Sequence, residues 1–284
     1  MTRRLTRSDP SYPPLLAAIH DPPPQLWIRG DADPELLSQP AVAIVGARAC
    51  SSYGRAVARS LGRDLTAAGV IVVSGMARGV DGEAHRGAVE AGGPTVAVLG
   101  CGIDRDYPAA HAELARRISE TGLIVSEYEP GVEPAPWRFP ARNRIIAGLS
   151  RAVVVVEARE RSGALITVDF ALEQGRDVLV VPGEITSALS AGVNALLRHG
   201  AAPALSVDDV LEAIGVVVAK AKRREPEGEA GRVLAVLRDA PATVDEVARA
   251  VVLPAAEVAA LLTELELDGL VQAGDGAYRA TIAP

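Results

Sequence analysis

The segment 137–151, WRFPARNRIIAGLSR, is locally basic in a chain whose net charge is −7. It has no acidic residue and four arginines, Arg138, Arg142, Arg144 and Arg151. Because Pro140 breaks the chain, a helix is expected to begin at Ala141 and to become apolar from Ile145 onward. Guanidinium groups beside the free N–H groups of a helix start favour an anion, and phosphate fits their fork geometry best. The segment is therefore predicted to contact a polyanion. The alternative is a set of arginines that only cap or salt-bridge a surface helix.

A turn of related composition follows the first long apolar run. The run AVAIV ends in Gly46-Ala47-Arg48, and Ser51 stands where the next helix should begin. Arg48 takes the place of the second glycine of a dinucleotide-binding GxGxxG turn, and the next run ends at Gly75 without an acid for a ribose. NAD binding is therefore not expected. An arginine on a tight turn beside a helix start suits a phosphate group; the alternative is a turn arginine that bonds neighbouring carbonyls.

The second turn repeats this combination of small residues and arginine. Gly75, Arg78 and Gly79 follow the second apolar run, and a helix with Asp81 and His85 comes next. Asp81 and His85 lie four residues apart on one helix face, so a structural hydrogen bond between them is expected. General-base chemistry is less favoured, because no nucleophile or metal cluster accompanies the pair.

The turn after residues 152–158 begins a helix with Ser162-Gly163-Ala164. Ser162 is a good N-cap, and small residues at a helix start leave backbone N–H groups open to an anion. No pattern indicates a catalytic group or a set of metal ligands. The candidate phosphate-binding residues are Gly46, Arg48, Ser51, Gly75, Arg78, Gly79, Arg138, Arg142, Asn143, Arg144, Ser162, Gly163 and Thr167.

The elements that must position these residues alternate between short apolar runs and helix-length segments. The runs cover residues 41–46, 70–75, 95–100, 123–127, 152–158 and 177–183, and the helical segments lie at about 51–68, 81–92, 109–121, 141–150 and 163–175. Because the runs are nearly unbroken Val, Ile and Leu, they are expected to be buried on both faces of a parallel sheet. We therefore predict an α/β fold with a doubly wound, mainly parallel Rossmann-like sheet. Ligands of such sheets bind beyond the carboxyl ends of the strands.

Length and composition narrow the function classes. A chain of 284 residues with 49% hydrophobic residues allows roughly two domains and a sizeable core. The two cysteines give no disulfide framework, the four histidines are scattered, and the apolar runs are only strand-sized. No cofactor, metal centre or membrane span is therefore predicted, and a reducing cytoplasm is the expected location.

The chain is expected to divide into segments of different character. These are a Pro-rich lead-in (1–40), an extended Rossmann-like domain (41–215), a charged linker (216–230) and an acidic winged-helix domain (231–284). Within the lead-in, a helix is expected at 15–19 and a strand at 25–29. Residues 226–284 hold ten acids and four arginines, a net charge of −6. The helix expected at 254–268 has no Lys or Arg and should repel DNA, so the winged helix is interpreted as a protein-contact or structural module.

Motifs in a fixed order and spacing give the chain a resemblance to a known family. They are VAIVGAR (42–48), VSGMARGVDGEAH (73–85), AVLGCGIDRDYP (97–108), FPARNRIIAGLS (139–150), VVVEARERSGALIT (154–167) and GRDVLVVPGEI (175–185). From about residue 12 to 201 the chain resembles the DNA-processing protein A (DprA/Smf) family. The winged helix after the linker is similar to the tail that many members carry.

The resemblance implies a protein without catalytic turnover that binds single-stranded DNA during natural transformation (competence). Members form homodimers, protect the incoming strand and help load the RecA recombinase for DNA recombination. The DNA contacts that the resemblance carries over are Arg48, Arg78, Gly79, Arg142, Asn143, Arg144, Ser162 and Gly163. Many members have a helical domain before the conserved core, of which residues 1–40 resemble only the trailing end. The chain also departs from the family at Ala47, where members often have serine, and in having few lysines.

Two alternatives remain open. Nucleoside-monophosphate phosphoribohydrolases that resemble plant LOG proteins carry a GGxGTxxE motif at the turn that corresponds to the one after residues 152–158, but this chain has Phe170 in place of the glutamate. That difference counts against hydrolysis. The other alternative is an interaction scaffold based on the acidic tail, which would bind no oligonucleotide.

On the leading hypothesis, the DNA is held through its phosphates. Aromatic residues are only 3% of the chain, so base stacking is a minor contact, although Trp137 and Phe139 could stack. Arg48→Ala or Arg142→Ala is expected to weaken oligonucleotide binding without lowering thermal stability. The helices around 194–214 are the candidate surface for dimerisation or RecA contact.

Overall fold

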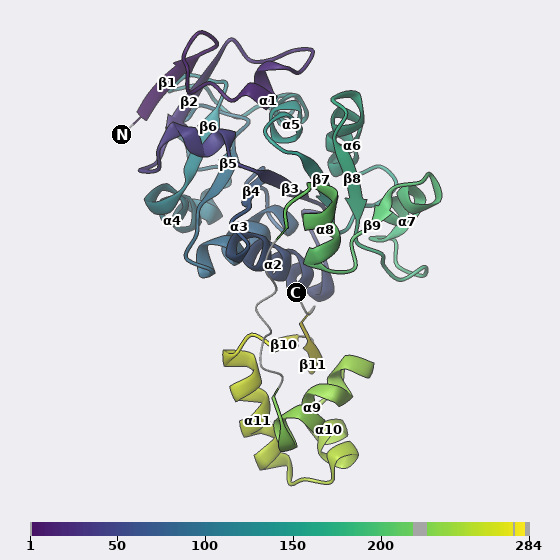
Figure 1. The fold of residues 1–284 in the computed structure, drawn as a ribbon. Coiled ribbons are helices and arrows are strands. Elements are labelled where there is room, and N and C mark those ends of the chain that lie inside the picture. Colours follow the sequence, from purple (N-terminus) through teal and green to yellow (C-terminus); the bar gives the residue numbers. More distant parts are fainter. Residues whose placement is uncertain (1, 218–225, 275, 282–284) are drawn as a thin grey trace. The chain divides into compact units, whose positions relative to one another are not determined.

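The six apolar runs form strands of a nine-stranded sheet in the computed structural model, which describes residues 2–217, 226–274 and 276–281. The strand order is β1-β2-β6-β5-β4-β3-β7-β8-β9 (Figure 1). The strands are β1 (Thr2–Thr6), β2 (Gln25–Arg29), β3 (Ala41–Val45), β4 (Ile71–Ser74), β5 (Thr95–Val98), β6 (Leu123–Ser126), β7 (Ala152–Val155), β8 (Asp177–Val180) and β9 (Ala202–Pro203). Neighbours from β6 to β9 are parallel, whereas β1 and β2 join antiparallel. The predicted doubly wound, mainly parallel sheet is thus confirmed.

Helices cover both faces of this sheet (Figure 1). One face carries α2 (Ser52–Ala67), α3 (Val80–Glu90), α4 (Ala112–Thr121) and α8 (Val207–Ala213), the other carries α1 (Pro14–Ala17), α5 (Arg138–Gly148) and α6 (Gly163–Glu173), and α7 (Ala191–Arg198) lies beside β8. Successive strand residues enter different layers: Val125 packs in the core with α5 and α6, and Ile124 packs in the core with α4. Burial on both faces explains why the runs in the sequence are unbroken rather than alternating.

Residues 1–40 differ from the expected lead-in, because they extend the sheet. The strand predicted at 25–29 is β2, and it pairs with both β1 and β6. Leu26 and Ile28 alternate with half-buried residues in β2 and pack, together with Leu5 of β1, in the main core. The Tyr12 hydroxyl donates to the Pro23 carbonyl at 2.7 Å and ties down the proline-rich connection. These residues therefore belong to the same compact unit as the parallel sheet.

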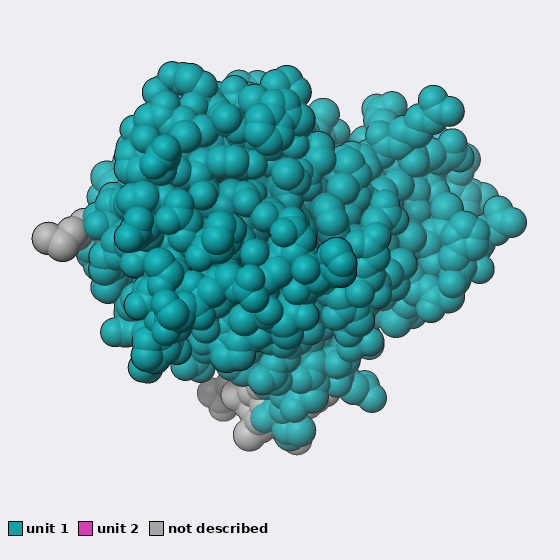
Figure 2. Space-filling view, turned by 90° about the horizontal axis from the view of Figure 1, so that it is seen from above, with its two compact units in different colours: residues 1–217 teal, residues 218–284 magenta. Residues whose placement is uncertain are grey.

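The chain divides into two compact units, residues 1–217 and residues 218–284. Figure 2 shows the first unit from above as one continuous body. Most of the linker predicted at 216–230 (residues 218–225) lies outside the described residues. No helix within the described ranges is both long enough and apolar enough to span a membrane.

The second unit has the elements of the predicted winged helix. These are α9 (Gly228–Asp239), α10 (Val244–Val251), α11 (Ala255–Leu267) and a hairpin of β10 (Val271–Gly274) and β11 (Ala277–Ala280). Val233, Val258 and Leu262 are fully buried and form its core with neighbouring apolar residues. The helix predicted at 254–268 is α11, and its acids Glu257 and Glu264 are exposed. This helix therefore offers a negative surface.

Candidate nucleic-acid interface

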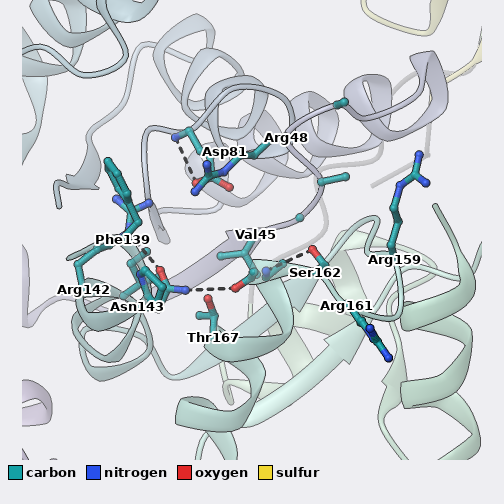
Figure 3. A pocket seen from close by; sticks show the side chains of 18 of the residues that line it. Val45, Arg48, Asp81, Phe139, Arg142, Asn143, Arg159, Arg161, Ser162 and Thr167 are labelled. Carbon is teal, nitrogen blue, oxygen red and sulfur yellow. Dashed lines mark hydrogen bonds between the residues drawn. The ribbon is translucent and has the colours of Figure 1, made fainter. Parts of the chain in front are cut away.

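The central feature of the first unit is the place where its chain connections change direction. β3 and β7 are parallel neighbours, but the strands that follow them in sequence, β4 and β8, lie on opposite sides of this pair. Crossovers that diverge in this way leave a crevice beyond the carboxyl ends of the strands, where doubly wound proteins bind ligands. A pocket of about 360 Å³ lies there, lined by the turns after β3 and β7 and by the first half of α5 (Figure 3).

The first and second turns pack directly on each other. Gly79 has a φ of +75°, and a Cβ at this position would lie 2.3 Å from the carbonyl oxygen of Ala47. The N–H of Val80 donates to the same carbonyl at 3.2 Å. Only glycine permits this approach without strain. The second turn thereby fixes the backbone from which Arg48 projects.

Arg48 is exposed at the mouth of the pocket. Its guanidinium carbon lies 5.7 Å from the ring centroid of Phe139, within range of a cation–π contact. The Phe139 ring is stacked in turn on Tyr107, with 5.2 Å between the centroids. Arg78 is also exposed but lies on the neighbouring turn, outside the pocket lining.

Helix α5 begins at Arg138, three residues earlier than predicted. The expectation that Pro140 breaks the chain was wrong, because Pro140 is the third residue of the helix. The first N–H groups of a helix have no intrahelical acceptor, so a proline there removes no bond. As a result Arg142 lies in the second turn of α5 rather than at a helix start with free N–H groups.

Arg142 is buried, only 4% exposed, beneath the pocket. Its Nη1 donates to the Gly75 carbonyl at 2.6 Å and to the Val98 carbonyl, and its Nε donates to the Asn143 side chain at 3.1 Å. Burial lowers the pKa of the guanidinium to about 10, and the charge of nearby Asp81 opposes that shift. Burial also raises the pKa of the Asp81 carboxyl. Arg142 therefore holds the ends of β4 and β5 together, with little surface left for a ligand.

The other polar residues of α5 point in different directions. The side-chain amide of Asn143 donates to the Gly163 carbonyl at 3.3 Å and so joins α5 to the start of α6. Arg144 forms a two-pronged ion pair with Glu127, at 2.9 and 2.7 Å, and a further pair with Asp21 at 3.0 Å. The guanidinium carbon of Arg138 lies 4.9 Å from the ring centroid of Tyr128 and 4.8 Å from that of Trp137. Arg144 and Arg138 are thus engaged outside the pocket.

The turn after β7 forms the opposite wall. The hydroxyl of Ser162 accepts from the Ala164 N–H at 3.3 Å, which caps α6, and Gly163 is exposed with open space around it. Arg159 and Arg161 line the pocket, are exposed and leave the loop in opposite directions (Figure 3). Across the described ranges, neither arginine forms an ion pair. Both are absent from the sequence-based candidates, although their place directly before an N-cap could have singled them out.

The pocket gathers only part of the predicted set. Its lining includes Gly46, Arg48, Arg142, Asn143, Ser162, Gly163 and Thr167, and it does not include Ser51, Gly75, Arg78, Gly79, Arg138 or Arg144. Gly75 and Gly79 act through the backbone, by admitting Arg142 and the first turn. Ser51 caps α2, where its hydroxyl accepts from Gly54. Thr167 is buried at the base of the pocket.

The expectation of a hydrogen bond between Asp81 and His85 was wrong. His85 Nδ1 lies 2.8 Å from the Thr95 hydroxyl oxygen, and that hydroxyl donates to the Val72 carbonyl at 2.6 Å. The Thr95 oxygen must therefore accept, so Nδ1 of His85 carries the proton. Burial lowers the pKa of His85 to about 3, which keeps the ring neutral. Within the described residues, no group of His, Cys, Asp and Glu side chains could hold a metal ion.

Comparison with known proteins finds a matching family model for each of the two units. The model of the family described as DNA recombination-mediator protein A matches residues 3–215, and that of the DprA winged helix domain matches residues 217–277. A putative DNA processing protein DprA of Mycobacterium tuberculosis is 43% identical over 89% of this chain and 68% of its own length.

Solved structures agree with this assignment. DNA processing protein A from Streptococcus pneumoniae has a TM-score of 0.70 and 44% identity, covering 74% of this chain and 73% of that one. The Helicobacter pylori protein, described for its single-stranded DNA binding mode, has a TM-score of 0.68 and 30% identity, covering 75% of this chain and 95% of that one. The chain therefore belongs to the DNA-processing protein A (DprA/Smf) family.

Proposed function

We propose that the protein binds single-stranded DNA through its backbone phosphates in the pocket between β3 and β7. One observation carries the proposal: Arg48, Arg159 and Arg161 are exposed on the pocket walls and, within the part of the chain that the structure describes, form no ion pair with a carboxylate. Three exposed guanidiniums beside the starts of α2 and α6 form a strong site for phosphate groups. Family membership and the single-stranded DNA binding of the Helicobacter pylori protein support the same ligand.

A flexible single strand suits this site better than a duplex. The arginines project from tight turns at the end of a sheet, so a ligand must bend into the crevice to bring its phosphates to them. Phe139, the single aromatic residue among those that line the pocket, already stacks on Tyr107 and lies against Arg48. Contacts are therefore mainly electrostatic, with little dependence on base sequence.

A nucleotide-hydrolysing enzyme fits the same pocket less well. Asp81 is the single acid among the lining residues, all of which the structure describes. It is 6% exposed and accepts from the Ala77 N–H at 3.3 Å, close to Arg142, so it serves a structural role. Phe170 stands where the related hydrolases carry glutamate. We therefore infer a binding protein rather than an enzyme.

The proposal predicts the binding behaviour of the wild-type chain. A fluorescent oligo-dT should bind more tightly than a duplex of equal length, and its affinity should fall steeply as salt rises, because each phosphate contact releases condensed cations. Fluorescence anisotropy over a salt series measures both effects. Equal affinity for duplex, or a binding constant that salt does not change, would contradict a phosphate site in this pocket.

The wider role that we propose is DNA processing in natural transformation and recombination, in the cytoplasm, as a homodimer that protects the strand and helps load RecA. Family membership supports this role. For the dimer surface, a groove of about 420 Å³ lies between α6 and α7 near the edge strand β9, and Leu172 beside it is 62% exposed. Leu172→Glu is expected to convert a dimer to a monomer in sedimentation equilibrium. RecA assembly on the oligonucleotide, timed with and without the protein, tests the loading step.

A further inference from the structure

The N-terminus of α2 is occupied by a carboxylate from another part of the chain. Glu157 follows β7, and its Oε2 accepts from the Ser51 N–H at 2.9 Å while its Oε1 accepts from the Ser51 hydroxyl at 2.5 Å. The side chain is only 4% exposed. Among the described residues, no arginine or histidine forms an ion pair with it. A buried carboxylate without a cation depends on the donors and the positive end of a helix.

The Glu157 carboxylate lies at a helix start where related folds bind a phosphate group. α2 follows β3, the first strand of the diverging pair, and the helix at this position binds the diphosphate of nucleotides in doubly wound folds. A carboxylate presents two acceptor oxygens and a negative charge, as the edge of a phosphate does. In this chain the charge comes from Glu157, which reaches across from the turn after β7.

The surrounding backbone is fitted to the carboxylate. A Cβ at Gly54, in the first turn of α2, would lie 2.5 Å from Glu157 Oε2 and 2.6 Å from its carboxyl carbon. The side chain of Glu157 therefore occupies space that only glycine leaves open. In contrast, a Cβ at Gly163, at the start of α6, would meet no atom within 4 Å, and this glycine lines the open pocket. The start of α2 is thus covered by Glu157, whereas the start of α6 is open to the pocket.

We propose that Glu157 is a specificity-determining residue that excludes free nucleotide diphosphates from α2. It fills the anion site of this helix, so a diphosphate meets a negative charge and finds the Ser51 donors already engaged. Anions are left with the arginine-lined pocket at the start of α6. Free nucleotide diphosphates and triphosphates are thereby kept away from the start of α2. The inference does not depend on which polymer the pocket binds.

Pyrophosphate and ADP are suitable probes, because they carry the excluded group with and without a nucleoside. In isotope-labelled wild-type protein, neither should shift the amide resonances of Ser51 and Gly54. Glu157→Ala should give saturable shifts at both amides, with pyrophosphate binding at least about tenfold tighter than in the wild type, since a repelling charge is lost and a helix start is opened. Glu157→Gln, which keeps the shape of the side chain, should give a smaller gain in the same direction.

Glu160→Gln is the matched control, since it removes one exposed acid from the same turn without opening α2. It should leave the Ser51 and Gly54 amides unchanged. Far-UV circular dichroism establishes that each variant is folded; if Glu157→Ala does not fold, Glu157→Gln decides the question. A folded Glu157 variant without new shifts at Ser51 and Gly54 would overturn the proposal, as would pyrophosphate shifts at these amides in the wild type. Oligo-dT binding, measured separately on the wild-type chain, reports on the proposed function and not on Glu157.

Discussion

A variant carrying both Arg48→Ala and Arg161→Ala is expected to bind oligo-dT about 100-fold more weakly than the wild type. The two side chains lie on opposite walls of the pocket and are exposed, so they can meet phosphates without breaking an ion pair, although Arg48 also lies against the Phe139 ring. A hydrogen bond to a charged group contributes about 1.5 kcal/mol to binding at the lower end of its range. Loss of two such bonds therefore raises the dissociation constant roughly 100-fold. Thermal stability should stay the same.

The salt dependence gives this prediction a second, independent measurement. For single strands, the slope of log affinity against log salt changes by about 0.7 for each phosphate contact, so the double variant should lose about 1.4 from the slope. Arg7→Ala is the matched control, because Arg7 is exposed and directly follows β1 at the far edge of the sheet. If Arg7→Ala weakens binding as much as the double variant does, the effect is one of overall charge, and the assignment of the pocket fails.

The second large effect is expected at Arg142, and it concerns stability first. Arg142→Ala removes the bonds to the Gly75 and Val98 carbonyls and takes a positive charge from beside buried Asp81. Breaking a buried charged contact of this kind costs about 3 kcal/mol, equivalent to a fall in Tm of roughly 10 °C for a domain of this size. Differential scanning calorimetry of the unfolding transition of residues 1–217 measures this fall in Tm. This replaces the expectation from sequence that Arg142→Ala leaves thermal stability unchanged.

A double-mutant cycle identifies the origin of that loss. In a background that carries Asp81→Asn, the acceptor for the Ala77 N–H remains but the buried charge is gone, so Arg142→Ala should cost less than it does in the wild type. Equal costs in both backgrounds would mean that Asp81 has no part in the effect. A variant with unchanged Tm and lost oligonucleotide binding would instead make Arg142 a direct phosphate contact.

The sequence predicts the sheet well because burial on both faces leaves a strong pattern. Runs such as 152–158 contain almost only Val and Ala, and the strand β7 forms within that run. The lead-in was harder to interpret, because β1 is mostly polar and pairs with β2 across a connection rich in proline. Such long-range antiparallel pairing has no local signature beyond the alternation in β2.

Sequence patterns supply only part of the information about the direction of each arginine side chain. Arg142 and Arg144 are two residues apart on a helix, which separates their side chains by about 200° around the axis. They therefore could not both face one pocket, and the structure directs Arg142 to the core and Arg144 to Glu127. Arg159 and Arg161 lie in an irregular turn without such periodicity, so their place just before the N-cap Ser162 is the signal that the sequence offers, and the folded chain shows that they line the pocket.

The two edges of the sheet have a consequence for how copies of the chain can associate. One edge is β1, which presents Arg3 and Arg4 beside Leu5, and charged side chains on an edge discourage pairing with a foreign strand. The other edge is β9, which is only two residues long and ends in Pro203, a residue without an N–H to donate. Backbone hydrogen bonds at either edge are thus poorly suited to strand addition. Extension of this nine-stranded sheet by a strand of another copy is therefore disfavoured at both of its edges.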